Sequence, residues 1–246
     1  MSTHLVKHQK ITKRQIKEDP LVTAAFKATA FWDQHGTKVL IGVGAVALIC
    51  VLAFFMMQAR NKAEAEASGD LFRASLAVQN GDYASAAPML EEIVKSQPGT
   101  DAAREAMLYL GDAQMSLGKP AEAATWYRKY LEKAGGDEVR ARIGHFALAT
   151  ALEDSRQYVP AAEEYAKAAE KSDTDNERAR AMHGQARSLV RASQMPKAVE
   201  IYTAITMLPD AEQSLADAAK SKLGELSAGP AAAPSTTAAP ATPAAP

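Results

Sequence analysis

The residues best suited to chemistry are adjacent carboxylates and lone histidines in the second half of the chain. Carboxylates and imidazoles are the groups used in general acid–base catalysis and metal ligation. The carboxylates form pairs at Glu91-Glu92 and Glu163-Glu164. They lie beside basic residues, which is typical of a solvated helix face, and lone histidines such as His145 and His183 are usually solvated or hydrogen-bonded. No nucleophile-elbow, phosphate-loop or zinc-protease motif is present. The sequence therefore predicts no catalytic residue, no cofactor and no enzyme activity.

Composition narrows the class of protein further. The only cysteine, Cys50, excludes an intramolecular disulfide, and no Cys/His spacing indicates a metal site. A net charge of -1 gives no reason to expect nucleic acid binding. Apolar residues make up 47% of the chain but aromatic residues only 6%, so alanine, leucine and valine must form the core. This balance favours closely packed helices over a sheet, and nothing in it indicates a small-molecule substrate.

Val39–Met57 is an uncharged run of 19 residues, VLIGVGAVALICVLAFFMM. As a helix it would be roughly 28 Å long, close to a bilayer core of about 30 Å. We therefore expect a transmembrane helix over residues 38–58. A cleaved signal peptide is the alternative, because cleavage after Ala65 or Ala67 would follow a small-x-small pattern. The length of the run and of the 38 residues before it favours a permanent anchor.

The leader sets the expected orientation. Its basic residues are Lys7, Lys10, Lys13, Arg14, Lys17, Lys27 and Lys38. A short basic tail resists translocation, so we expect a cytoplasmic N-terminus and an extracytoplasmic C-terminal part. Asp19-Pro20 resembles a helix start, and apolar residues follow at helical spacing, which indicates an interfacial helix. A disordered tail that only directs topology is the alternative.

Four later segments align without gaps: NGDYASAAPMLEEI, LGKPAEAATWYRKY, SRQYVPAAEEYAKA and ASQMPKAVEIYTAI. Each carries alanine at one fixed place, and these anchor alanines are separated by 37, 38 and 37 residues. They are Ala86, Ala123, Ala161 and Ala198. Such a period is typical of a solenoid of helix pairs, in which a single unit is too small to bury its own core.

Neighbouring positions predict how the helices pack. Twelve residues before the anchors lie small residues, which allow two antiparallel helices to approach: Ala74, Gly111, Ala149 and Ala186. Four residues after the anchors lie larger ones: Leu90, Tyr127, Tyr165 and Tyr202. Seven residues after them lie Ile93, Tyr130, Ala168 and Ile205. This arrangement resembles the tetratricopeptide repeat, which has Gly/Ala, Ala and an aromatic residue at corresponding places.

The sequence departs from that repeat in its turns. The usual tryptophan near the start is absent, and the closing proline has partial matches only in Pro98 and Pro209. Because the period exceeds the standard 34, we expect longer turns between repeats, at Gly135-Gly136 and residues 172–175.

The expected fold is all-α: an N-terminal transmembrane helix, then a tetratricopeptide-like α-solenoid of about four helix pairs and a closing helix over Ala211–Leu226. The expected domains are a basic cytoplasmic tail (1–37), the membrane helix (38–58), the repeat domain (59–226) and a tail (227–246). The last segment is rich in alanine and proline, has no charge and offers little to bury, so we expect it to be disordered.

The resemblance implies a concave groove lined by the first helix of each pair. The corresponding candidate protein-binding residues are Leu71, Ser75, Val78, Leu108, Asp112, Met115, Phe146, Thr150, Glu153, His183, Arg187 and Arg191. Such a groove would be apolar in the first two repeats and basic in the fourth, where Arg180 adds to the positive charge. It would suit an extended or helical peptide with apolar anchors and a terminal acidic group.

The whole layout resembles the bacterial ancillary Sec-translocon-subunit family, which combines an inside N-terminus, one span and an extracytoplasmic tetratricopeptide-like domain. The resemblance implies a protein of the bacterial inner membrane with a periplasmic domain. Its partners would be the translocon, periplasmic chaperones or envelope proteins. The basic leader and the Ala/Pro tail depart from the family pattern. Two alternatives remain: a periplasmic scaffold that coordinates cell division or cell-wall and outer-membrane assembly, and an enzyme built into the groove.

Overall fold

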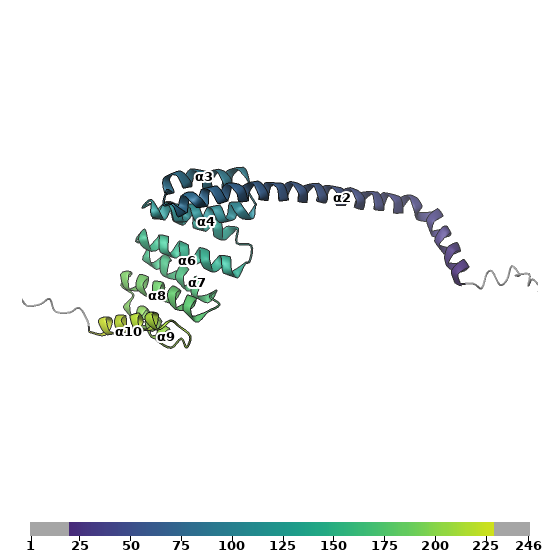
Figure 1. Cartoon of the computed structure of the whole chain (residues 1–246). Coiled ribbons are helices and arrows are strands. Elements are labelled where there is room, and N and C mark those ends of the chain that lie inside the picture. Colours follow the sequence, from purple (N-terminus) through teal and green to yellow (C-terminus); the bar gives the residue numbers. More distant parts are fainter. Residues whose placement is uncertain (1–19, 229–246) are drawn as a thin grey trace, which may run out of the picture. The chain divides into compact units, whose positions relative to one another are not determined.

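The computed structural model describes residues 20–228. These residues form nine helices, α2 to α10, and no strand, so the predicted all-α class is confirmed (Figure 1). The chain divides into two units, Met1–Asn61 and Lys62–Pro246. Helix α2 (Pro20–Gln79) contributes residues to both units.

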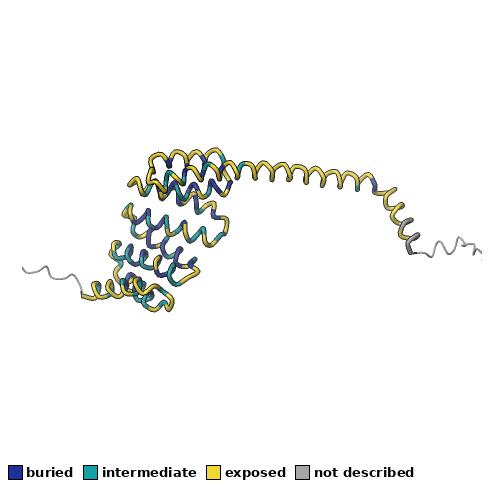
Figure 2. The backbone as a smooth tube through the Cα atoms, viewed as in Figure 1, coloured by how far each residue is buried: buried dark blue, intermediate teal, exposed yellow. Residues whose placement is uncertain are grey.

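In the first unit, the described residues belong to α2. The helix contains an 18-residue window with a mean hydropathy of 2.9, none of which is buried (Figure 2). By length and composition this segment is able to cross a membrane, as an anchor or a signal sequence would. The helix expected to begin near Pro20 is the start of α2, which continues through Val39–Met57. The proposed cap Asp19 lies outside the described residues.

In the second unit, the end of α2 and eight further helices form four consecutive pairs and a closing helix. The eight helices are α3 (Tyr83–Ser96), α4 (Asp101–Ser116), α5 (Pro120–Glu132), α6 (Glu138–Asp154), α7 (Tyr158–Glu170), α8 (Asp175–Arg191), α9 (Met195–Thr206) and α10 (Gln213–Ser227). Each helix from α3 to α10 contacts the next one along the chain. Helix α2 joins α3 through a shared apolar cluster that contains Leu71 and Leu90. The predicted pairs are therefore α2–α3, α4–α5, α6–α7 and α8–α9, and α10 is the closing helix.

The turn inside each pair has the same geometry. Its central residue has a positive φ: 76° at Gly81, 74° at Gly118, and 61° at both Arg156 and Ser193. The next amide bonds back to the helix, as from Gln194 to the Leu189 carbonyl at 2.9 Å. This six-to-one bond is the Schellman motif, which satisfies carbonyls at a helix end.

The turns between pairs are more varied. Gly135 and Gly136 both have positive φ in the turn between α5 and α6, where the sequence predicts a long connection. The turn predicted at residues 172–175 lies one position earlier, at residues 171–174, because α7 ends at Glu170 and α8 begins at Asp175. Thr174 explains this start, since its side chain accepts a hydrogen bond from the Glu177 amide and caps the helix.

The core confirms the repeat register. The predicted packing positions, four in each of four repeats, are all buried. The anchor alanines are each 0% exposed, and the tyrosines that follow them are at most 2% exposed. Gly111 shows why small residues are needed, because a Cβ atom there would lie 2.3 Å from Cε1 of Tyr127. Figure 2 shows dark blue buried stretches along the helices of the array, between intermediate and exposed ones.

Candidate protein-binding site

Helices α6 and α8, the first helices of repeats three and four, contact one another directly. Residues three or four apart lie on one face of a helix, so each helix presents a row of side chains. The α6 row is Arg142, Phe146, Thr150 and Glu153. The α8 row is Glu177, Arg180, Gly184, Arg187 and Arg191. We call these two rows together the α6/α8 face.

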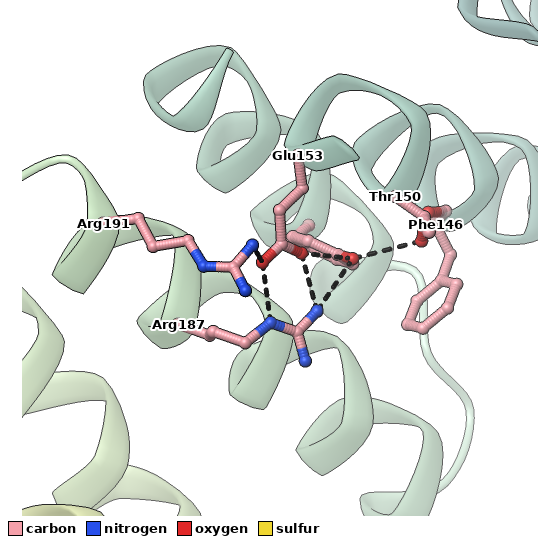
Figure 3. A network of polar contacts seen from close by, with 6 residues as sticks. Phe146, Thr150, Glu153, Arg187 and Arg191 are labelled. Atoms are coloured by element: carbon pink, nitrogen blue, oxygen red, sulfur yellow. Dashed lines mark hydrogen bonds and ion pairs between the residues drawn. The ribbon is translucent and has the colours of Figure 1, made fainter. Parts of the chain in front are cut away.

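One end of this face is a polar network around Glu153 (Figure 3). Arg187 donates from Nε to Oε1 at 2.7 Å and from Nη2 to Oε2 at 2.6 Å, a bidentate pair. Nη1 of Arg191 lies 3.0 Å from Oε1, and the Tyr165 hydroxyl donates to Oε2 at 3.1 Å. The Tyr165 hydroxyl also lies 3.1 Å from Oγ1 of Thr150. Glu153 is only 3% exposed, so this carboxylate is buried but fully paired.

The surroundings of Glu153 fix its charge. Burial, the largest influence, raises its pKa, but the hydrogen bonds and charge of Arg187, with help from Tyr165 and Arg191, bring the pKa below its usual value. The hydrogen bond to Glu153 raises the pKa of Arg187. Burial, aided by the Glu153 charge, raises the pKa of Tyr165 to about 12. At neutral pH the network therefore holds one carboxylate and two guanidinium groups, with one positive charge in excess.

The other end of the face is an ion pair beside a small pocket. Nη2 of Arg142 lies 2.8 Å from Oε1 of Glu177. The pocket has a volume of about 180 Å³ and is lined by Arg142, Phe146, Ala168, Ser172, Glu177, Arg180 and Ala181. Its size is below the roughly 300–1,000 Å³ of small-molecule sites, so it suits a single side chain, with Phe146, Ala168 and Ala181 as its apolar lining.

Phe146 connects the pocket to the network. Its ring meets the Tyr165 ring edge to face, with centroids 5.4 Å apart. The side chain is 39% exposed, although it belongs to a helix packed on both neighbours. An aromatic ring held in place by a buried tyrosine, yet open to solvent, is a ready contact for an apolar group.

The structure brings five of the sequence-predicted groove residues together on this face: Phe146, Thr150, Glu153, Arg187 and Arg191. The sixth residue of repeats three and four, His183, packs edge to face on Tyr202 with centroids 5.6 Å apart. Burial, with Arg187 and Lys222 nearby, lowers the pKa of His183 and favours its neutral form. At the repeat-four end of the face, Glu153 partly neutralises the charges of Arg187 and Arg191.

The six groove residues predicted in repeats one and two serve mainly in packing. Leu71 is 8% exposed and belongs to the core, so its side chain does not face a groove. Val78 packs on the same cluster as Leu71, whereas Leu108 and Met115 pack on a second cluster.

The two polar members of this group are also bonded within the domain. Ser75 donates to the Phe72 carbonyl at 2.8 Å. Asp112 accepts a 2.6 Å hydrogen bond from the Tyr127 hydroxyl. Burial raises the pKa of Asp112, and the bond from Tyr127 offsets part of that rise.

Three residues of the α6/α8 face escaped the sequence analysis. Arg142 and Glu177 form its ion pair, and Gly184 leaves room for Tyr165, because a Cβ atom at Gly184 would lie 2.6 Å from Cε1 of that ring. Helical spacing from Phe146 and Arg187 could have indicated Arg142 and Gly184. Glu177 follows only from knowing which residues face each other across two repeats.

One expectation about carboxylates requires correction. Glu164 is not on a solvated face, because its side chain is 14% exposed and Oε2 lies 2.6 Å from Nδ1 of His145. Lys167 donates to its other oxygen at 2.6 Å. Burial raises the pKa of Glu164, but His145 and Lys167 together lower it below its usual value. The described residues contain no group of three or more His, Cys, Asp or Glu side chains that could hold a metal ion.

Comparison with known proteins agrees with this geometry. Residues 71–138 match the tetratricopeptide repeat family. No curated protein sequence matches the chain. The nearly identical TPR-like repeats of a Podosopora anserina protein described as a kinesin light chain superpose with a TM-score of 0.55 and 19% identity, covering 66% of this chain and 85% of that one. MamA 41-end from Desulfovibrio magneticus RS-1 gives a TM-score of 0.51 and 17% identity, covering 66% of this chain and 95% of the other.

These likenesses concern the fold of the helical array and not its ligands. The match to the repeat family covers the end of α2 and all of α3, α4 and α5, and the superpositions extend over two thirds of the chain. The structure itself indicates the same fold, because it has four helix pairs with a small residue at every crossing. The second unit is therefore a tetratricopeptide-like repeat domain, the architecture of a protein-interaction scaffold.

Proposed function

We propose that this protein is a membrane-anchored scaffold that binds a segment of a partner protein on the α6/α8 face. The observation that carries the proposal is the pocket beside Phe146. The Arg142–Glu177 ion pair forms part of the pocket lining, and Phe146 connects the pocket to the Glu153 network through Tyr165. Apolar anchor pockets with polar surroundings are the usual form of energetic centres in protein interfaces.

The chemistry of the face defines the partner segment. One apolar side chain would fill the pocket against Phe146. Acidic groups nearby would meet Arg180 and Arg191, whose side chains are 64% and 48% exposed. Arg180 is the more available of the two, since its only ion-pair contact in the described structure, to Glu212, is long at 3.9 Å. An apolar anchor flanked by acidic residues is therefore the expected motif.

Binding fits this face better than catalysis. Glu153 and Glu164, the least exposed carboxylates near it, are both held by cationic or imidazole partners. A carboxylate with a lowered pKa is a poor general acid or base at neutral pH. These groups stabilise the repeat array instead of facing an open reaction site.

The apolar segment of α2 supports a location for the scaffold. It is long enough to span a bilayer, and basic residues are concentrated in the short leader before it. We place the N-terminus in the cytoplasm and the repeat domain in the periplasm. The resemblance to ancillary translocon subunits then makes the translocon, periplasmic chaperones and emerging envelope proteins the expected partners.

A second candidate is an envelope scaffold for cell division or wall assembly. It is favoured by the 18 residues after Ala228, which consist of alanine, proline, glycine, serine and threonine and have a composition typical of a linker. Deleting Gly229–Pro246 should impair function if the tail extends the reach of a scaffold. The same deletion should have little effect on translocon-associated binding.

The test is photo-crosslinking in cells with a probe at Phe146, followed by mass spectrometry of the adducts. A probe at Val199 is the matched control, because Val199 is 38% exposed and Phe146 is 39% exposed, and Val199 lies on α9 outside the α6/α8 face. Adducts specific to Phe146 with translocon components, chaperones or envelope proteins would support the first candidate. Division or wall-synthesis proteins would favour the second. Equal adducts from both probes would mean that the face is not a binding site.

A further inference from the structure

The first helix of repeat one carries an exposed stripe that the first helices of the later repeats bury. Moving along the chain by the repeat intervals relates Gly69, Phe72 and Leu76 of α2 to three positions in each of α4, α6 and α8. These counterparts are Ala106, Tyr109 and Ala113; Gly144, Ala147 and Ala151; and Ala181, Gly184 and Ser188. Seven of these nine are buried, and Tyr109 and Ala147 are half-buried against the core.

These counterparts pack against the helices of the preceding repeat. Ala106 and Ala113 are 0% exposed and share a cluster with residues of α2 and α3. A Cβ atom at Gly144 would lie 2.7 Å from Leu131 of α5, and one at Gly184 would lie 2.6 Å from Tyr165 of α7. The stripe is thus the surface on which a helix docks at every internal boundary of the array.

In α2 the same stripe has no neighbour among the described residues. Phe72 is 64% exposed and Leu76 is 42% exposed, whereas Leu71, on another face of the helix, is 8% exposed. A Cβ atom built at Gly69 would meet nothing within 4 Å. With Ala65, the stripe has the four-three-four spacing of a coiled-coil seam. We call Ala65, Gly69, Phe72 and Leu76 the α2 stripe.

The opposite end of the array is closed. Helix α10 covers repeat four with Ala219, which is 0% exposed, and with partly buried leucines. Its other side is polar, and the side chains of Asp217 and Lys220 are both 58% exposed. Solenoids need such a polar cap at each end, because an open terminal repeat leaves apolar surface in water. The described chain therefore caps one end of the array and leaves the other open.

The remaining parts of this chain do not supply the missing cap. Residues 229–246 contain no large apolar side chain that could pack on Phe72 and Leu76. Residues 1–19 precede the apolar segment of α2 and, in the topology proposed above, lie on the far side of the membrane. A second copy, in contrast, brings an identical apolar stripe to the same side of the membrane.

We propose that two copies of the chain pair through the α2 stripe, independently of what the α6/α8 face binds. In a two-fold contact each stripe meets itself, so Phe72 and Leu76 of the two copies cover one another, and Gly69 allows the helices to approach. Glu66 and Arg73 beside the stripe are already paired on their own helix, with Lys62 and Asp70, so neither brings an unpaired charge to the contact. Anchoring in one membrane raises the effective concentration of the two copies.

The experiment uses the full chain in its membrane, with Cys50→Ser as background. Oxidative crosslinking of Leu76→Cys should give a species of twice 26.2 kDa, whereas Asp217→Cys, on the outer side of α10, should give none. Crosslinks of equal yield at both positions would show random collision and overturn the proposal. A Leu76→Cys crosslink to a different protein would assign the stripe to that protein instead.

A second variant separates the stripe from the membrane helix. Phe72→Glu with Leu76→Glu should halve the mass of the detergent-solubilised chain in light scattering, from twice 26.2 kDa to 26.2 kDa. Far-UV circular dichroism should stay unchanged, because both side chains are exposed. A wild-type monomer would overturn the proposal. So would a dimer that survives the double change, since the contact would then lie in the apolar segment of α2.

Discussion

Asp112 in repeat two and Arg187 in repeat four occupy the same repeat position, directly after the small residue of the first helix, yet they connect different parts of the domain. Asp112 accepts a hydrogen bond from Tyr127 of its own repeat. Arg187 reaches back to Glu153 of repeat three. The first two repeats are joined mainly by apolar side chains such as Leu110, whereas the last two are also joined by a buried ion network.

This difference shows how one repeat can serve two purposes. At the first boundary Leu71 of α2 is buried in an apolar cluster that it shares with residues of α3 and α4. Polar contacts at the later boundary hold Phe146 at the surface beside a pocket. In repeats three and four the residues that stabilise the array are therefore also those that shape the candidate site, so stability and binding should change together there.

The largest expected effect comes from removing both cations of the network. Arg187→Ala with Arg191→Ala leaves the buried Glu153 carboxylate unpaired, which should lower the free energy of unfolding by about 3–5 kcal/mol. Urea unfolding of the solubilised chain, followed by circular dichroism, measures the change. Arg180→Ala is the control, because its exposed pair with Glu212 should contribute only about 0–1 kcal/mol. Equal losses in both variants would show that the network does not distinguish the last two repeats.

A smaller loss should follow from filling a helix crossing. Gly184→Ala places a Cβ atom 2.6 Å from Tyr165 and should cost about 1–3 kcal/mol through overpacking. Gly111→Ala tests a crossing inside one helix pair, because a Cβ atom there would lie 2.3 Å from Tyr127 of the same repeat, whereas Gly184 meets Tyr165 of the preceding repeat. Gly224→Ala in α10 meets nothing within 4 Å and should stabilise by about 0.5–1 kcal/mol. If the three melting temperatures agree, close helix approach is not what the small residues provide.

The residues of these two predictions differ in whether the sequence alone could identify them. The small and aromatic positions were predictable because each repeat needs them at a fixed place, and four copies show the pattern. The Glu153 network was not, because it joins residues 34 and 38 positions apart that occur in a single copy. The sequence analysis places Arg187 and Arg191 among the candidate protein-binding residues. Their shared buried partner Glu153 means that they also stabilise the fold.

Lowering the pH should change the stability contributions of Glu153 and Asp112 in opposite directions. The pKa of Glu153 is lowered in the folded state, so its contribution to stability is present above the usual glutamate pKa of 4.5 and is lost as pH falls through the lowered value. Glu153→Gln should therefore flatten the fall of melting temperature between pH 7 and pH 3. Glu164 has a lowered pKa as well, so part of the fall should remain.

Asp112 provides the opposite case. Its pKa is raised above the usual 3.8, so the folded state takes up this proton more readily and gains stability as pH falls through the raised value. Asp112→Asn removes that gain and should make the acid-induced fall steeper. Parallel pH profiles for Asp112→Asn and Glu153→Gln would contradict the contrast between the two boundaries.

The smallest expected effect concerns the turns inside the helix pairs, which also differ between the halves. Glycine holds the positive-φ position in repeats one and two, but Arg156 and Ser193 hold it in repeats three and four, both at 61°. A side chain in this region costs about 1–2 kcal/mol, and glycine adds roughly 0.5–1 kcal/mol of chain entropy to the unfolded state. Arg156→Gly and Ser193→Gly should therefore each stabilise by about 0.5–1 kcal/mol, measured by thermal melting. Gly81→Ala should show the reverse sign, because it introduces the strain that the later turns already carry. If Arg156→Gly instead lowered the melting temperature, the Arg156 side chain would have to stabilise the fold by more than its backbone strain costs.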